Sequence, residues 1–263
     1  MKETLNISYE NVILGYAILA IPIFIFLYYK TQMLKDLIIS VLRMTLQLAF
    51  VALYLEYIFK WNNAYINSAW VIVMIVASAW SSVKHSELKR KHLIVPMLIA
   101  GFFSILITDA YFLGIVIKLD YVFEARYFIP ISGMILGNML KYNAVGLNTY
   151  FSSIQKDQNL YFFLLVHNNQ KLALLPFIRE AFKKAMNPYI GTIAIIGLVS
   201  LPGMMTGQIL GGSSPVVAIK YQIMIVISIF VACVLNLFLS LQIANMFVFD
   251  IKGRLKSDVL AKK

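Results

Sequence analysis

Seven stretches of predominantly apolar sequence, each about as long as a bilayer is thick, dominate this chain of 263 residues. A helical span needs roughly 20 apolar residues, because each residue rises about 1.5 Å through a hydrocarbon layer about 30 Å thick. Soluble domains carry about 25% charged residues, whereas only 13% of this chain is charged. The sequence therefore predicts an all-α, polytopic transmembrane helical bundle that forms one domain, residues 1–263. The expected spans are Tyr9–Tyr29, Leu37–Phe59, Ala64–Val83, Leu93–Ile117, Phe128–Val145, Pro188–Leu210 and Val216–Phe249.

The basic residues lie mainly on one side of the predicted spans. With the N-terminus outside, 17 Lys and Arg residues fall in inner segments and four in outer ones. This bias favours an outer N-terminus, an inner C-terminus and an odd number of spans, in a cell inner or plasma membrane. The net charge of +11 is confined to short blocks between apolar runs, without a basic stripe interleaved with aromatic residues. We therefore expect the lipid bilayer, and no nucleic acid, as a partner.

One polar segment between predicted spans is long, residues 146–187, and it lies on the inner side. Its apolar residues, among them Leu160, Phe163 and Leu172, recur at helical spacing. Pro176 is expected to break the segment into two short helices. Such an amphipathic segment either lies on the lipid headgroups or docks a soluble partner.

Proline and glycine interrupt the apolar run that ends at Leu210. Pro202 lacks an N–H group, and the glycines that follow it permit unusual backbone conformations. Discontinuous helices near the bilayer midplane form substrate sites in many transporters, whereas the alternative is a kink that serves close packing. Under the first hypothesis a bulky side chain at Gly203 should abolish transport without preventing insertion. The predicted pathway residues here are Pro202, Gly203, Met204, Thr206, Gly207 and Gln208.

A second glycine pair, Gly133 and Gly137, has the spacing that places both residues on one helix face. Close helix–helix packing explains this spacing, and a pathway that includes Met134 and Asn138 is the alternative.

Three polar residues within other predicted spans are also candidate site residues. Arg43 and Gln47 are one turn apart and share a face, so Arg43 either reaches the headgroups or pairs inside the bundle. Asp109 lies in the fourth span, and a carboxylate at membrane depth is a functional candidate. If that span ends early, Asp109 lies at the outer interface instead.

Catalytic and nucleotide-binding motifs are absent from the sequence. There is no Walker A motif, so ATP hydrolysis would require a separate chain. His85, His92 and His167 all fall in predicted inner segments without a second histidine at ligand spacing, and no metal site is assigned. We expect a transport protein that binds no cofactor, not an enzyme.

The segments singled out above resemble the marked segments of the FetB-like ABC permeases. The resemblance rests on Leu201–Leu210 followed by Pro215 and the pair Tyr221-Gln222, on Gly133-Met134 with Gly137-Asn138, and more weakly on Arg43 with Gln47-Leu48. It adds Gln222 to the candidate pathway residues.

The resemblance implies a pair of permease chains working with two cytoplasmic ATPase subunits, which use ATP and Mg²⁺, to export iron. Plant relatives are linked to aluminium tolerance and nucleotide-sugar transport, so a different small molecule is one alternative and an ATPase-independent channel or carrier is another. Family members commonly carry Leu-Gly-Ala where the ATPase is expected to dock. Here the matching residues are Val166, His167 and Asn168, with Leu172 beyond them.

Overall fold

The computed structural model describes residues 7–86, 88–250 and 252–256, and helices account for most of them. No strand occurs among these residues, so the predicted all-α class is confirmed. The helices are α1 (Tyr9–Tyr16), η1 (Ala17–Leu19), α2 (Ala20–Tyr28), α3 (Leu34–Trp61), α4 (Ala64–His85), α5 (Arg90–Asp109), η2 (Ala110–Val116), α6 (Ala125–Lys156), α7 (Gln158–His167), α8 (Gln170–Ile195), α9 (Gly203–Leu210) and α10 (Pro215–Val248).

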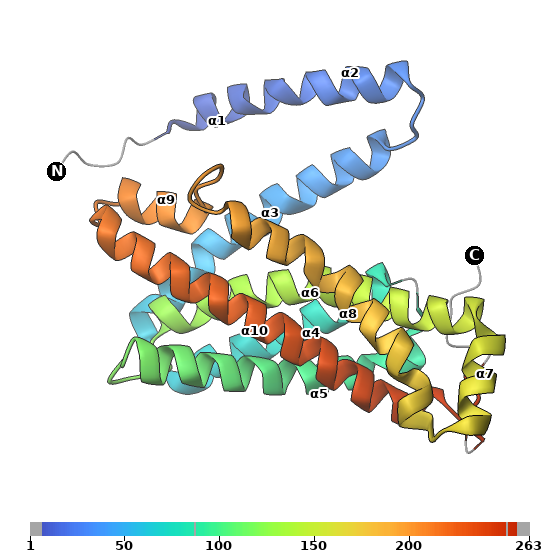
Figure 1. Ribbon diagram of the computed structural model, residues 1–263. Helices are drawn as coiled ribbons and strands as arrows, with labels where there is room; N and C mark the ends of the chain where they lie inside the picture. The colour runs from blue at the N-terminus through green and yellow to red at the C-terminus, as the bar shows by residue number, and fades with distance from the viewer. Residues whose placement is uncertain (1–6, 87, 251, 257–263) are drawn as a thin grey trace.

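The core is a bundle of long helices around α10, which packs against α5, α6, α8 and α9 (Figure 1). The face of α10 that enters the bundle carries small residues, and Ala232, Cys233 and Ala244 are fully buried there. Small side chains let helix backbones approach closely, which drives association where lipid removes the hydrophobic effect between helices. Helix α4 completes the core by packing against α5 and α6.

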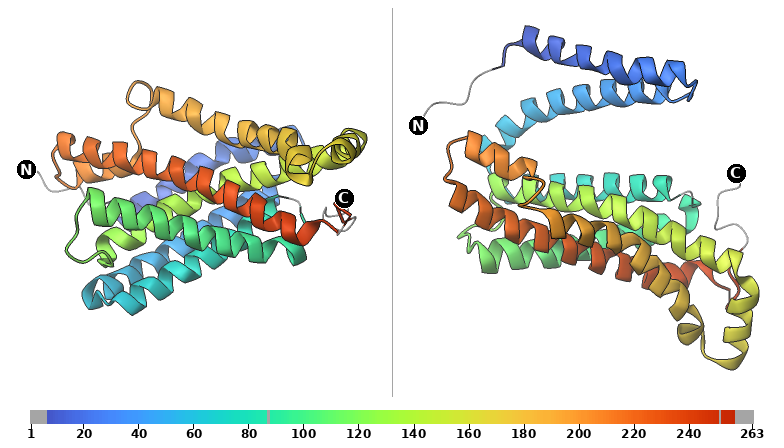
Figure 2. Two further views of the ribbon diagram at one scale, coloured as in Figure 1. Left: turned by 60° about the horizontal axis from the view of Figure 1, so that its bottom comes forward. Right: turned by 45° about the horizontal axis from the view of Figure 1, so that its top comes forward.

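The first helices stand apart from this core (Figures 1 and 2). Within the described chain no side chain of α1 or α2 is buried, and Ile58 is the single buried residue of α3. The hydroxyls of Tyr16 and Thr45 lie 2.6 Å apart and join the two arms of this N-terminal hairpin. The hairpin meets the core at the end of α3, where the ring of Tyr54 lies 4.2 Å from that of Trp70.

Among the described residues, five helical segments are long and apolar enough to cross a membrane, and each coincides with a predicted span. They are Tyr9–Tyr28, Leu34–Trp61, Ala64–His85, Lys91–Val116 and Pro215–Val248. The predicted span Phe128–Val145 lies within the longer helix α6, which begins at Ala125 and continues to Lys156. The chain is thus a multi-pass membrane protein, and the count of seven and the orientation stay predictions.

The expectation that Pro176 breaks the long polar segment is wrong. Pro176 lies inside α8, which runs unbroken from Gln170 to Ile195. The proline removes one hydrogen bond near the start of the helix, but Ala173, Leu174 and Phe177 are buried around it, and this packing outweighs the loss. The actual break lies just before α8, where the Asn169 side chain accepts the N–H of Leu172 at 3.0 Å and caps the helix.

Candidate functional site

The predicted span Pro188–Leu210 is interrupted, but the helix ends several residues before Pro202, the proline expected to break it. Helix α8 ends at Ile195, and Gly197 has a φ of +90°, a conformation that L-residues with a side chain rarely adopt. The N–H of Gly197 donates to the carbonyl of Ser200 at 3.0 Å and closes the turn. Pro202 does not break a helix here. It is the N-cap residue from which α9 begins, a position where a missing N–H group costs nothing.

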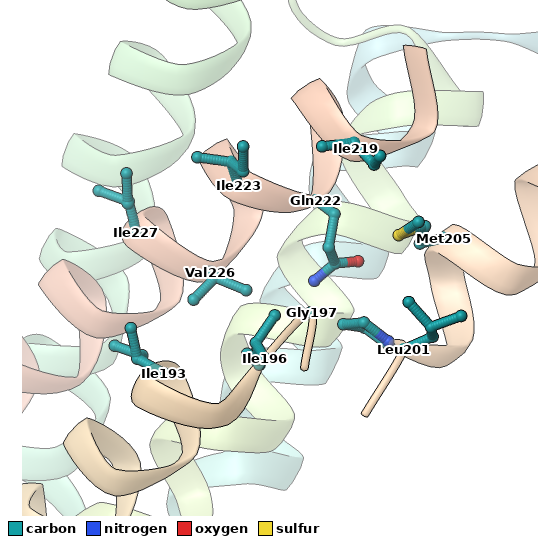
Figure 3. Close-up of a pocket in the computed structure, with 11 residues that line it drawn as sticks. Ile193, Ile196, Gly197, Leu201, Met205, Ile219, Gln222, Ile223, Val226 and Ile227 are labelled. Carbon is teal, nitrogen blue, oxygen red and sulfur yellow. The ribbon is translucent and has the colours of Figure 1, made fainter. Parts of the chain in front are cut away.

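A cavity of about 510 Å³ lies between this interruption and α10 (Figure 3). The end of α8 and the turn form one wall, and the first part of α10 forms the other. Most of the lining is aliphatic, and the Gln222 side chain points into the space from α10. The lining residues are Ile193, Ile196, Gly197, Leu201, Pro202, Met205, Ile219, Gln222, Ile223, Val226 and Ile227.

Gln222 supplies the polar group of this cavity. The residue is 8% exposed, and its Oε1 atom has no hydrogen-bond partner among the described residues. An unpaired buried amide oxygen costs free energy, so the site favours a ligand that donates a hydrogen bond. The thioether of Met205 adds one soft, polarisable group. The cavity thus suits a largely apolar molecule, or an apolar part of one, with a donor group.

Asp109 is buried inside the bundle, and it does not lie at an exposed interface. The side chain is 3% exposed, and the Ser132 hydroxyl on α6 donates to its Oδ2 atom at 2.5 Å. The Oδ1 atom has no partner among the described residues. Asp109 is the last residue of α5 before the π-helical turn η2, and such turns often occur at functional sites. It borders a second cavity, of about 300 Å³, between α4, α5 and α6.

Replacing Ser132 with alanine is expected to destabilise the bundle by about 1–2 kcal/mol, because both carboxylate oxygens of Asp109 then lack a partner. The midpoint of unfolding by denaturant in detergent measures the effect. Ser152→Ala is the control on the same helix, because that hydroxyl bonds the Asn148 carbonyl at 2.6 Å on an exposed face. Adding Asp109→Leu to Ser132→Ala should restore stability, and a double variant less stable than either single one would contradict the pairing.

A further polar contact lies in the core between α6 and α10. The Asn143 amide donates to Asn236 Oδ1, which also accepts the Ser240 hydroxyl at 3.1 Å. All three residues are buried. Because hydrocarbon offers no alternative partners, such contacts fix the register of neighbouring helices.

The structure brings together only some of the predicted pathway residues. Pro202 and Gln222 line the cavity, whereas Met204, Thr206, Gly207 and Gln208 lie on α9 outside its lining. The Gln208 Oε1 atom is buried without a partner among the described residues. Arg43 and Gln47 are exposed on α3 and do not line the cavity, so within this chain neither side chain is buried in the bundle.

The glycine pair on α6 divides between two environments. A Cβ atom on Gly133 would lie 3.2 Å from the Met74 side chain on α4, whereas one on Gly137 would meet nothing within 4 Å. Met134 is half-buried, and Asn138 donates to its carbonyl at 2.9 Å. Neither residue borders the cavity.

The predicted docking residues lie around α7, at the opposite end of α10 from α9 (Figure 1). Tyr161 is buried on the face of α7 that packs against the bundle, and its hydroxyl donates to the Gly253 carbonyl at 2.6 Å. Burial raises the pKa of Tyr161 above its ordinary value, so the hydroxyl stays a neutral donor. Val166 is 81% exposed. His167, Asn168 and Leu172 are exposed as well.

Several cavity residues were missed by the sequence analysis. Gly197 is a single glycine within an apolar run, and its positive φ had no proline or polar neighbour to signal it. The isoleucines of α8 and α10 look like any lipid-facing residues in sequence. Ser132 stands next to the glycine pair, but its pairing with Asp109 depends on the register of α5 against α6.

Comparison with known proteins places these features in a family. The model of the uncharacterised protein family UPF0014 matches residues 9–249. The chain is 27% identical to the UPF0014 membrane protein YjkA of Bacillus subtilis, over 95% of this chain and 99% of the relative. It is 34% identical to the probable iron export permease protein FetB of Escherichia coli, over 84% of each.

The similarity extends to plants. The chain is 30% identical to the protein ALUMINUM SENSITIVE 3 of Arabidopsis thaliana, over 72% of this chain and 68% of the relative. No solved structure matches the chain significantly. The match across almost all described helices, together with permease relatives, shows that this chain belongs to the UPF0014 family of membrane permeases.

Proposed function

We propose that the chain is the membrane subunit of an ABC exporter, that two copies pair, and that a separate cytoplasmic ATPase docks at α7 and the start of α8. The observation that carries this proposal is the continuity of α8. One helix of 26 residues connects the predicted docking end to the interruption at Ile196. At about 1.5 Å per residue this helix is about 39 Å long. A tilt imposed at its inner end would therefore reposition the cavity wall at its outer end.

The exposed face of α7, which points away from the bundle, supports docking of a soluble partner. Phe163 is 61% exposed, its ring is tilted against that of His167 with centroids 4.5 Å apart, and Val166 lies beside them in the sequence. Large exposed apolar residues that share a face mark an interaction surface. The opposite face holds α7 to the bundle through Tyr161, whose ring lies 6.0 Å from that of Phe177 on α8. A force applied to α7 would therefore reach α8 directly.

Val166→Asp is expected to reduce the amount of ATPase subunit that co-purifies with the tagged chain by at least tenfold, because a carboxylate in an apolar contact costs about 2 kcal/mol or more. Quantitative mass spectrometry after gentle detergent extraction from the native membrane measures this. Gln158→Asp, which adds the same charge at the exposed start of α7, should have no such effect.

Either of two results would count against docking at α7. In the first, no ATPase accompanies the wild-type chain even after crosslinking. In the second, Gln158→Asp and Val166→Asp reduce its recovery equally. The first result would favour the channel or carrier alternative, and the second would favour an α7 that lies on lipid headgroups.

For the substrate, we propose iron, on the basis of the relation to FetB. Uptake of ferrous ion into inside-out vesicles that contain the chain and its co-purified ATPase tests this proposal, with and without ATP. ATP-dependent accumulation supports iron export, and accumulation without ATP contradicts the ABC class.

A second candidate is an amphiphilic organic solute, and the cavity at Gln222 favours it. Its lining is aliphatic apart from one amide and one thioether, whereas a bare ferrous ion prefers imidazole or oxygen ligands. Among the described residues no group of three or more His, Cys, Asp and Glu gathers to hold a metal ion. Stimulation of ATPase activity by amphiphilic compounds, but not by ferrous ion, would select this candidate.

A further inference from the structure

A third cavity, separate from the candidate pathway, opens at the inner end of the bundle. It has a volume of about 410 Å³ and lies between the last turn of α4, the middle of α6 and α8. Its lining residues are His85, Leu140, Lys141, Ala144, Val145, Asn148, Thr149 and Lys184. None of these residues lines the cavity at Gln222, so the two sites can be altered independently.

The polar part of this lining is basic. Lys141 and Lys184 approach it from two helices, and His85 from a third, while no described acidic residue lines it. Neither lysine forms an ion pair with a described residue. Lys141 instead lies 5.5 Å from the ring centroid of its neighbour Tyr142. Two ammonium groups at one cavity whose described lining holds no acidic side chain generate a potential that favours an anion.

Hydrogen-bonding groups accompany the charges. His85 Nδ1 lies 2.8 Å from the Ser81 carbonyl oxygen, which fixes the ring and leaves Nε2 for another partner. The Asn148 amide donates to the Ser86 carbonyl at 2.8 Å, which fixes that side chain beside the cavity. These groups come from separate helices, as in pockets between membrane helices that hold lipid headgroups.

The rest of the lining is apolar and lies at the edge of the predicted hydrocarbon layer. Val145 ends the predicted fifth span and His85 ends α4, so the cavity lies where α4 and α6 leave the membrane on the side with most basic residues. Leu140, Ala144 and Val145 supply the apolar part of the lining, and Ala144 and Val145 share one face of α6 with Lys141. A phosphate at the lysines would therefore lie at about the depth of the inner-leaflet headgroups.

We propose that this cavity binds the phosphate of an anionic phospholipid from the inner leaflet through Lys141 and Lys184. The proposal does not depend on the transported substrate or on the ATPase. Free phosphate esters share the same chemistry, and the experiment separates the two sources.

The test uses the full chain, purified in detergent and returned to nanodiscs that contain phosphatidylcholine and phosphatidylglycerol. Native mass spectrometry after release measures the ratio of retained phosphatidylglycerol to phosphatidylcholine. We expect the wild-type chain to retain phosphatidylglycerol preferentially. Each of Lys141→Gln and Lys184→Gln should lower that preference about fivefold, which is the factor that one basic side chain contributes near an anionic headgroup.

Lys183→Gln is the matched control, because Lys183 is the neighbour of Lys184, is exposed like it, and does not line the cavity. It should leave the preference unchanged. Lys141→Arg and Lys184→Arg should retain it, which separates loss of charge from loss of fold. Equal loss in Lys183→Gln would show a diffuse surface field and overturn the site, as would a wild-type chain with no preference.

A soluble source is tested by adding inorganic phosphate or glycerol phosphate to the purified protein. Displacement of phosphatidylglycerol only at concentrations far above that of the lipid supports a lipid site. Tight binding of glycerol phosphate that is lost in Lys141→Gln would retain the phosphate chemistry and assign a soluble ligand. Binding of neither lipid nor phosphate, with ATPase recovery lost in Lys184→Gln, would overturn the proposal and make the cavity part of a protein interface.

Discussion

Gly146→Val is expected to destabilise the bundle by about 1–3 kcal/mol, which is the usual cost of overpacking a well-filled core. A Cβ atom on Gly146 would lie 2.6 and 2.8 Å from the two Cδ atoms of Leu237, and 3.3 Å from its Cγ atom. Leu237 is fully buried on α10, so its side chain has no open space to enter. Helices α6 and α10 would have to separate, and the Asn143–Asn236 contact beside them would be strained.

The control for this prediction lies on the same helix. Gly137→Val adds the same side chain where nothing lies within 4 Å, so it changes helix propensity without overpacking. The unfolding midpoint in detergent should fall for Gly146→Val and not for Gly137→Val. Adding Leu237→Ala to Gly146→Val should recover part of the loss, because the two residues share one space. Equal midpoints for the two glycine variants would show that α6 and α10 pack less closely than the distances between Gly146 and Leu237 require.

Gly197→Val should lower transport about five- to thirtyfold. A side chain at the positive φ of Gly197 costs about 1–2 kcal/mol, and a branched Cβ atom is among the least tolerated there. The equilibrium between the turn that ends α8 and its competitors would then shift against the turn by about that factor. ATP-dependent transport into vesicles is the measurement, with the amount of inserted protein determined in parallel.

Gly203→Val provides the comparison for the same assay. The sequence suggested Gly203 as the sensitive glycine, but a Cβ atom there meets nothing within 4 Å, and the residue begins α9 without a positive φ. The structure therefore transfers the expected sensitivity from Gly203 to Gly197. Loss of transport in Gly203→Val alone would instead indicate that a partner outside this chain contacts α9.

The membrane spans were predictable because hydropathy depends on composition and length alone. The five apolar segments long enough to cross coincide with predicted spans to within a few residues at each end. The break before α9 was also predictable in its existence, since Pro202 and the nearby glycines disfavour a continuous helix. The position of the break was harder to predict, because proline at residue 202 indicates a helix break more strongly than the single glycine, Gly197, that forms the turn.

Tertiary contacts explain the larger errors. The missing N–H group of Pro176 predicted a helix break there, but burial of Phe177 and its neighbours keeps α8 intact. The pairing of Asp109 with Ser132 and the gathering of Lys141 with Lys184 both depend on which helices are neighbours. A single sequence contains no direct record of that arrangement, so these sites had to come from the structure.

The detached N-terminal hairpin separates two properties that most membrane proteins combine in the same helices. These first helices leave the ribosome before any core helix exists, and almost none of their surface is later covered by this chain. Their insertion must therefore rest on their own affinity for lipid, whereas the stability of the bundle comes from α4 to α10. Biogenesis and folding of this permease thus depend on different parts of the chain.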